Sequence, residues 1–330
     1  MYFWSTAGLH AEDCKPLRLI ASVDMIPGEY APYVPVTLNG KQKYMILDTG
    51  GAYSLISPDS VRELGLGAFR RDFSESDVAG KTTDMFAIVN DFSMAQLVSH
   101  NARFLISPHK LGEKAAGTIA PNFLEQFDVE LDFAAHKVNF FSQDHCEGKV
   151  IYWPAAFAAV VPMRVTGLGH IYLKATLDGH KFNTVLDTGF TSSMLNMTDA
   201  QNVFGLTPQS PGIEPGDELN GDPTLKNYFY RFKTLTLEGM TVTDPRIQLL
   251  PDLMKARMDR SSYMEARLGA FDNSEARGLP ALVIGYSILK HLHIYIAYKE
   301  QKLYITPATP PEAAPSAANP ATPGATAATH

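Results

Sequence analysis

Two stretches of the chain share one pattern at a constant offset. Residues 36–50 are VTLNGKQKYMILDTG, and residues 175–189, lying 139 positions further along, are ATLDGHKFNTVLDTG. Each contains an Asx-Gly pair, Asn39-Gly40 or Asp178-Gly179, of the kind that favours a type I′ hairpin turn because both positions take positive φ. The second expected strand of each hairpin ends in Asp-Thr-Gly. The repeat therefore predicts two related β lobes in one chain.

A second pair of segments also repeats. Residues 119–124 (IAPNFL) and 284–289 (IGYSIL) are each followed by alternating apolar positions, and their offset is 165 residues. Each segment predicts a buried strand, a short helical turn and then a β-hairpin. The larger offset places additional residues in the second half, including the charged stretch Asp252–Leu268. We expect a solvated surface helix there, with a lid over a cleft as the alternative.

Short helices are expected after both Asp-Thr-Gly motifs. Ser57 followed by Pro58 is typical of an N-cap and a first helical residue, and Gly65 stands where such a helix would end. Thr198 and Gly205 are expected to play the same parts in the second half.

Composition supports a mostly β chain with turns. The 330 residues are 45% hydrophobic and include 22 Pro and 24 Gly. We expect an N-terminal arm over 1–31, a first lobe over 32–153 and a second lobe over 154–305. The Pro, Ala and Thr-rich segment 306–330 cannot bury enough apolar surface to order itself, so a disordered tail is expected.

Charge and hydropathy exclude several classes of partner. The formal net charge is −7 and no basic stripe occurs, which argues against a nucleic-acid partner. No run of 18 apolar residues is present, so no membrane-spanning helix is expected. His291 and His293 lack an obvious third ligand, and no metal site is expected.

The chain has two cysteines, Cys14 and Cys146. Two unrelated thiols are one interpretation. The other is a single disulfide that ties the N-terminal arm to the end of the first lobe, as suits an exported protein. We favour the disulfide.

The repeated motif supplies one carboxylate from each half, Asp48 and Asp187. Two carboxylates about 3 Å apart cannot both ionise, so they share one proton. The ionised member can act as general base on a water, while the protonated member donates to a carbonyl oxygen. This chemistry needs neither a metal nor another cofactor. A structural Asx turn is the alternative for each residue.

The other motif residues suit the same arrangement. Gly50 and Gly189 allow tight turns in which backbone amides face the carboxylates. Thr49 and Thr188 are small, and their hydroxyls can form hydrogen bonds across the junction between the lobes.

These features resemble the pepsin and retropepsin superfamily of aspartic peptidases, and are most similar to bacterial exported proteins with tandem retropepsin-like domains. The resemblance covers residues 32–305. It implies a two-lobed fold with Asp48 and Asp187 at the floor of a cleft, and a metal-independent endopeptidase acting on peptides or unfolded proteins. A monomer in the periplasm or outside the cell is expected. The flap over the cleft is expected at Val78–Lys81, with Gly80 at its tip.

The chain departs from the superfamily pattern at three places. Gly51 and Phe190 follow the motifs where Ala, Ser or Thr is usual, and Ala120 stands where the second half has Gly285. The flap tyrosine of pepsins has no clear counterpart. A non-catalytic two-lobed module that binds extended peptides is therefore the alternative function.

Overall fold

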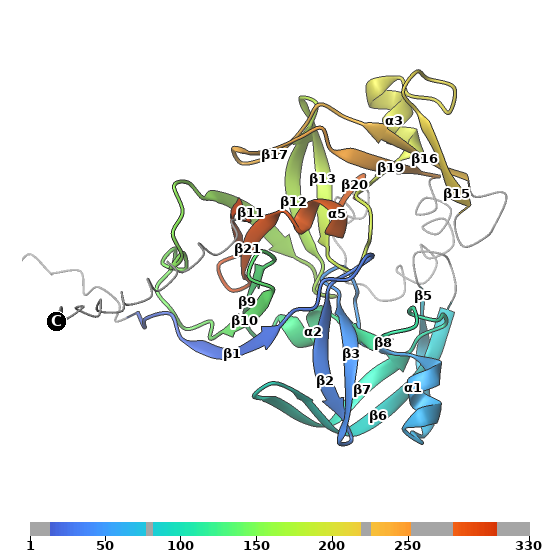
Figure 1. Ribbon diagram of the computed structural model, residues 1–330, viewed down its shortest axis with the longest axis vertical. Coiled ribbons are helices and arrows are strands. Elements are labelled where there is room, and N and C mark those ends of the chain that lie inside the picture. Colours follow the sequence, from blue (N-terminus) through green and yellow to red (C-terminus); the bar gives the residue numbers. More distant parts are fainter. Residues whose placement is uncertain (1–13, 77–81, 219–225, 252–279, 309–330) are drawn as a thin grey trace, which may run out of the picture.

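The structure, a computed structural model, describes residues 14–76, 82–218, 226–251 and 280–308. Strands dominate these residues and form two lobes beside a shared sheet, which confirms the expected mostly β fold (Figure 1). Three expectations lie outside the described residues: the flap tip at Gly80, the helix over Asp252–Leu268 and most of the C-terminal tail.

The first lobe is a single curled sheet. Both of its first two strands alternate between buried and less buried side chains, as a sheet packed on one face requires. The strand over Tyr33–Leu38 also pairs with the strand over Thr82–Met94, which closes the sheet toward a barrel. In spatial order the strands are β2 (Tyr33–Leu38), β3 (Lys41–Leu47), β8 (Ala115–Ile119), β4 (Leu55–Ile56), β7 (Leu97–Ile106), β6 (Thr82–Met94) and β5 (Ala68–Ser76).

The second lobe repeats this plan at the opposite end of the molecule in Figure 1. The strand that carries its motif, His180–Asp187, again forms a hairpin with the strand before it, Ile171–Leu177. The motif strand also pairs in parallel with Leu282–Gly285, which comes from the second repeated segment. A small ribbon of β17 (Thr234–Leu237) and β18 (Met240–Thr243) pairs with β12. The main strands in spatial order are β11 (Ala159–Val165), β12 (Ile171–Leu177), β13 (His180–Asp187), β20 (Leu282–Gly285), β14 (Met194–Asn196), β19 (Arg246–Leu250), β16 (Lys226–Arg231) and β15 (Glu214–Glu218).

Strands from both halves join in the shared sheet. Its order is β1 (Leu19–Asp24), β10 (Lys137–Phe141), β9 (Asp128–Asp132), β21 (Leu292–Ala297) and β22 (Lys302–Pro307), continuing to β11. The antiparallel pairing of β9 with β21 links the halves, and it buries a hydrogen bond between Glu130 and His293 with 2.7 Å between Oε1 and Nε2. Thr306 and Pro307, assigned to the tail by composition, instead complete β22, because the ladder pairs them with His293 and Leu292.

The predicted hairpin turns are confirmed. Asn39 and Gly40 have φ of 46° and 80°, and Asp178 and Gly179 have φ of 44° and 85°. Positive φ at both central positions defines the type I′ turn that the Asx-Gly pairs favour. The second repeat is confirmed as well, since a short helix follows each buried strand: α2 (Pro121–Leu124) after β8 and α5 (Tyr286–Leu289) after β20.

The two expected helices also form, with one correction. Ser57 caps α1 (Pro58–Glu63), and its hydroxyl accepts a hydrogen bond from the Ser60 amide. The cap of α3 (Met197–Phe204) is Asn196 rather than Thr198. Asn196 has extended backbone and its side chain accepts from the Asp199 amide at 2.6 Å, so the helix begins one residue before Thr198.

Cys14 and Cys146 form a disulfide, with 4.8 Å between their Cα atoms. The bond ties the segment before β1 to the segment after β10, at the outer side of the shared sheet. None of the helices in the described part of the chain is long and apolar enough to cross a membrane.

Candidate active site

The two Asp-Thr-Gly loops leave the ends of equivalent strands. Asp48 follows β3, which runs parallel to β8, and Asp187 ends β13, which runs parallel to β20. The Asp48 amide donates to the Ile119 carbonyl at 2.9 Å, so the downstream repeat segment fixes where the loop begins. Each lobe therefore uses one copy of both repeats to place one carboxyl group.

The two loops are joined through their threonines. The Thr49 amide donates to Thr188 Oγ1 at 3.1 Å, and the Thr188 amide donates to Thr49 Oγ1 at 3.0 Å. Each hydroxyl then donates to the opposite lobe, Thr49 to the Leu186 carbonyl at 3.0 Å and Thr188 to the Leu47 carbonyl at 2.6 Å. Both threonines are fully buried. The predicted bonding across the lobe junction is thus present.

Backbone amides hold one oxygen of each carboxyl group. Asp48 Oδ1 accepts from the Gly50 and Gly51 amides at 3.1 and 2.8 Å. Asp187 Oδ1 accepts from the Gly189 and Phe190 amides at 2.8 and 3.0 Å. Such bonds stabilise a carboxylate and fix its plane.

The glycines make room for the opposite carboxyl group. A Cβ added at Gly189 would lie 2.5 Å from Asp48 Oδ1, and one at Gly50 would overlap the Asp187 carboxyl group. Each carboxyl group therefore lies against the motif glycine of the opposite lobe. The structure therefore brings the two acids together at the lobe junction, where both side chains remain only half-buried.

The electrostatics favour one shared proton. Burial, and then the charge of Asp48, raise the pKa of Asp187 well above its ordinary value. Burial also raises the pKa of Asp48, but the Gly51 and Gly50 amides and the hydrogen bond from Asp187 oppose that effect. Of the two groups, Asp187 is the one whose pKa the neighbouring carboxylate raises.

A serine behind each loop fixes it to the downstream strand, which the sequence analysis did not identify. Ser54 Oγ bonds to Asn122 Oδ1 at 2.9 Å and accepts from the Ala120 amide at 3.0 Å. Ser193 Oγ accepts from the Gly285 amide at 3.0 Å, and the Ser193 amide donates to Ser287 Oγ at 3.2 Å. Ser54 and Ser193 lie at the same offset as the motif, so the repeat itself contained the signal.

The departures from the superfamily pattern fit the local packing. In the first lobe a Cβ at Gly51 would lie 3.4 Å from the Ala120 methyl group and 2.7 Å from Asp48 Oδ2. Because Gly51 has no side chain, the methyl group of Ala120 has room beside it. In the second lobe the Phe190 carbonyl would lie 2.6 Å from a Cβ at Gly285. Glycine is therefore required at 285, while alanine is accommodated at 120.

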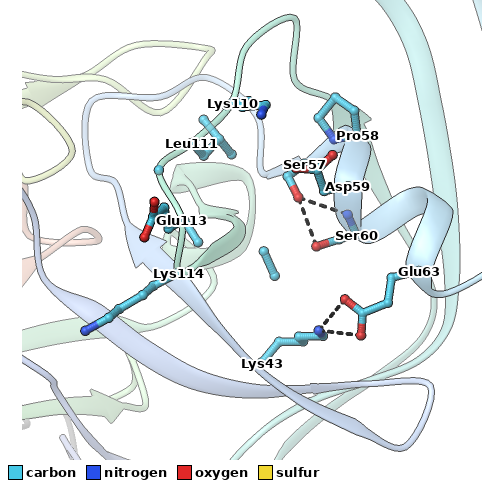
Figure 2. Close-up of a pocket in the computed structure, with 13 residues that line it drawn as sticks. Lys43, Ser57, Pro58, Asp59, Ser60, Glu63, Lys110, Leu111, Glu113 and Lys114 are labelled. Atoms are coloured by element: carbon cyan, nitrogen blue, oxygen red, sulfur yellow. Dashed lines mark hydrogen bonds and ion pairs between the residues drawn. The ribbon is translucent and has the colours of Figure 1, made fainter.

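The one pocket outlined in Figure 2 lies elsewhere in the first lobe. Two pairs of its polar side chains bond to each other: Lys43 to Glu63 at 2.6 Å, and Ser57 to Ser60 at 2.9 Å. It contains no motif residue. Within the described residues, no group of three or more His, Cys, Asp or Glu side chains could hold a metal ion.

Both halves of the chain match the model of one known protein family. A family model described as "Aspartyl protease" matches residues 34–123 and 173–287, together more than half of the chain. Each matched segment contains one Asp-Thr-Gly motif and the strand and turn that follow it. No curated protein sequence matches. Among solved structures, the crystal structure of basic 7S globulin from soybean has a TM-score of 0.48 and 10% sequence identity, over 89% of this chain and 96% of that one.

Proposed function

Because this chain belongs to the aspartyl protease family, we propose that it is an endopeptidase that hydrolyses peptide bonds with water activated by Asp48 and Asp187. The observation that carries the proposal is the position of two half-buried carboxyl groups, each held by two backbone amides and each lying against the motif glycine of the opposite lobe.

The two acids take different roles in this proposal. Asp48, kept ionised by the Gly50 and Gly51 amides, is the general base that accepts a proton from the attacking water. Asp187, whose pKa is raised by burial and by the charge of Asp48, is the acid that protonates the carbonyl oxygen of the scissile bond. Metal and cofactor have no part in these steps.

The surrounding loop residues have positioning roles. Gly50 and Gly189 admit the opposite carboxyl group, and Thr49 and Thr188 lock the two loops together. A rigid frame of this kind supports catalysis because the acids are held in their working geometry before substrate arrives. A pure binding module would gain nothing from placing two like-charged groups in contact.

The proposed substrate is an extended peptide or an unfolded protein lying between lobe 1 (32–153) and lobe 2 (154–305), covered by a flap at Gly80. The strands on either side of this segment in the chain, β5 and β6, pair with each other in the first lobe. The Cys14–Cys146 disulfide supports a periplasmic or secreted location, since such bonds persist in oxidising compartments.

The test is a cleavage assay on an unfolded protein across pH, using wild type, Asp48→Asn and Asp187→Asn. The surface substitution Asp91→Asn is the matched control. We expect a bell-shaped profile on the acid side, insensitive to chelators and to serine or cysteine reagents, and loss of turnover in both motif variants only. Intact mass must exclude deamidation back to Asp.

Two results would count against the proposal. Cleavage that persists in both motif variants would place the chemistry elsewhere. Peptide binding without cleavage at any pH in wild type would favour the non-catalytic module.

A further inference from the structure

The loop that carries Asp48 is attached to one downstream segment at both of its ends. At its start the Asp48 amide donates to the Ile119 carbonyl at 2.9 Å. At its end the Ser54 amide donates to Asn122 Oδ1 at 2.8 Å, and the Ser54 hydroxyl donates to the same oxygen at 2.9 Å. Ile119 ends β8 and Asn122 lies in α2, which follows directly. The turn from β8 into α2 therefore holds the whole loop.

The equivalent loop of the second lobe is also held by backbone bonds from α5. The Tyr286 amide donates to the Phe190 carbonyl at 2.8 Å, and the Ser287 amide donates to the Thr191 carbonyl at 2.9 Å. The Ser193 amide then donates to Ser287 Oγ at 3.2 Å. The side chain at 287 therefore supplements an attachment that the backbone already makes.

A proline removes the first of these backbone bonds from the first lobe. By the two repeat offsets, Pro121 corresponds to Tyr286 and Gly51 corresponds to Phe190. Proline has no amide hydrogen, so Pro121 cannot donate to the Gly51 carbonyl. Within the described residues, no backbone hydrogen bond from α2 reaches the loop carbonyl groups at positions 51 and 52. The first lobe must therefore hold the end of its loop in another way.

We propose that Asn122 is a positioning residue for Asp48, because its side-chain oxygen supplies the attachment of the loop that Pro121 removes from the backbone. The inference rests on the proposed function only for its consequence in catalysis. The Ser54 hydroxyl that donates to Asn122 also accepts from the Ala120 amide at 3.0 Å. Ser54 is thus fixed to α2 through Asn122 and to the residue before α2 through Ala120.

The attachment affects Asp48 because the bonds that hold this carboxyl group lie inside the loop. The Gly50 and Gly51 amides donate to Asp48 Oδ1 at 3.1 and 2.8 Å, shortly before Ser54 in the chain. Both bonds favour the ionised form and lower the pKa of Asp48 against the effect of burial. When the end of the loop is released from α2, the two amides are free to shift, and the carboxylate loses part of this support.

Positioning and stability are separable at Asn122. The residue is exposed, so water can bond to the Ser54 amide and hydroxyl once the side chain is removed. Water satisfies these groups without fixing the loop relative to α2. The midpoint of thermal unfolding should therefore fall far less in Asn122→Leu than in Thr49→Val, where fully buried groups lose their partners. Equal falls in the two variants would overturn the positioning role in favour of a structural one.

The primary test measures the two carboxyl groups and needs no turnover. Their ¹³C resonances are titrated in wild type, Asn122→Leu, Asn122→Ser and Gln126→Leu, with assignments from Asp48→Asn and Asp187→Asn. These three substitutions change no charge, so a shift of the pKa cannot come from an added or lost charge. We expect Asn122→Leu to raise the lower apparent pKa of the pair by about 0.5 unit.

Two of these variants calibrate the result. Asn122→Ser places a hydroxyl where the second lobe uses that of Ser287, so its shift should be smaller than that of Asn122→Leu. Gln126→Leu removes an exposed amide that donates to the Asn122 carbonyl just beyond α2, and it should leave the titration unchanged. Identical titrations of wild type and Asn122→Leu would overturn the inference.

A double-mutant cycle tests the link to the proline. Pro121→Ala restores an amide hydrogen at the position from which Tyr286 donates in the second lobe. The pKa shift caused by Asn122→Leu should therefore fall by about half or more when the substitution is made in the Pro121→Ala background. Equal shifts in both backgrounds would overturn the proposed compensation.

The kinetic readout should agree with the titration. The value of kcat should fall by about 10-fold in Asn122→Leu with KM nearly unchanged, because the loop holds an acid and not the substrate. Ser287→Ala should lose less, since the backbone bonds of α5 remain. An equal loss in the two variants would overturn the difference between the lobes. If wild type shows no turnover at any pH, the proposed function fails, and the titration still decides the role of Asn122.

Discussion

Thr49 and Thr188 exchange reciprocal hydrogen bonds, each amide donating to the other hydroxyl at 3.1 and 3.0 Å. Because each hydroxyl also donates to a carbonyl of the opposite lobe, the pair makes four hydrogen bonds in a region without solvent access. These four bonds therefore fix the position of one lobe relative to the other beside the two carboxyl groups.

Replacing either motif threonine by valine tests this junction. Thr49→Val or Thr188→Val keeps the shape but leaves a buried amide and a buried carbonyl without partners, which should lower the free energy of unfolding by about 2–4 kcal/mol. Urea unfolding measures the change. The exposed Thr241→Val is the control, and Thr49→Ser should retain most of the stability. Equal stability of Thr49→Val and Thr241→Val would show that the junction bonds contribute little.

Substituting a motif glycine should displace the opposite acid. In Gly50→Ala the new methyl group overlaps the Asp187 carboxyl group, so the pair must separate or the loop must shift. We expect cleavage to fall by about 10²-fold or more, since displacement of this order is costly in catalysis. Gly167→Ala is the matched control because nothing lies within 4 Å of its Cβ position. Unchanged activity in Gly50→Ala would contradict the described packing.

The raised pKa of Asp187 predicts that the free energy of unfolding falls as pH rises. Burial and the charge of Asp48 keep this group protonated in the native state at pH values where the unfolded chain has released the proton. The resulting stability is complete below the unfolded pKa near 4 and is lost as pH rises toward the native value.

Asp187→Asn lacks this titration, so its free energy of unfolding relative to wild type should improve by about 1.4 kcal/mol per pH unit within that window. Chemical denaturation at several pH values measures the difference, with Asp91→Asn as control. A difference between wild type and Asp187→Asn that stays constant from pH 4 upward would mean that the native pKa is not raised.

The disulfide should contribute strongly because the chain it closes is long. Cys14 and Cys146 are separated by 132 residues, and reduction should lower the free energy of unfolding by about 4–5 kcal/mol in the chain-entropy description. Guanidinium unfolding with and without dithiothreitol measures this. The double variant Cys14→Ser/Cys146→Ser should unfold at the lower midpoint under both conditions. Sensitivity to dithiothreitol in that variant would assign the effect to something other than the bond.

The sequence by itself determined the repeat and, through it, the plan of the fold. Asn39-Gly40 and Asp178-Gly179 fix the hairpin turns because their local conformational preferences need no tertiary partner. The matched spacing to Asp48 and Asp187 then places one acid at the end of each motif strand. Helix starts were less certain, since Asn196 and Thr198 are both good caps and only the backbone geometry selects Asn196.

Tertiary structure decided whatever depends on contacts between the two halves. Nothing local to Glu130 indicates that it bonds to His293, because this hydrogen bond joins residues 163 positions apart through the pairing of β9 with β21. The compensation between Gly51 and Ala120 is likewise visible only once two strands meet. Local preferences are encoded residue by residue, whereas the raised pKa of Asp187 depends on burial and on the charge of Asp48, which act only after the two lobes have packed together.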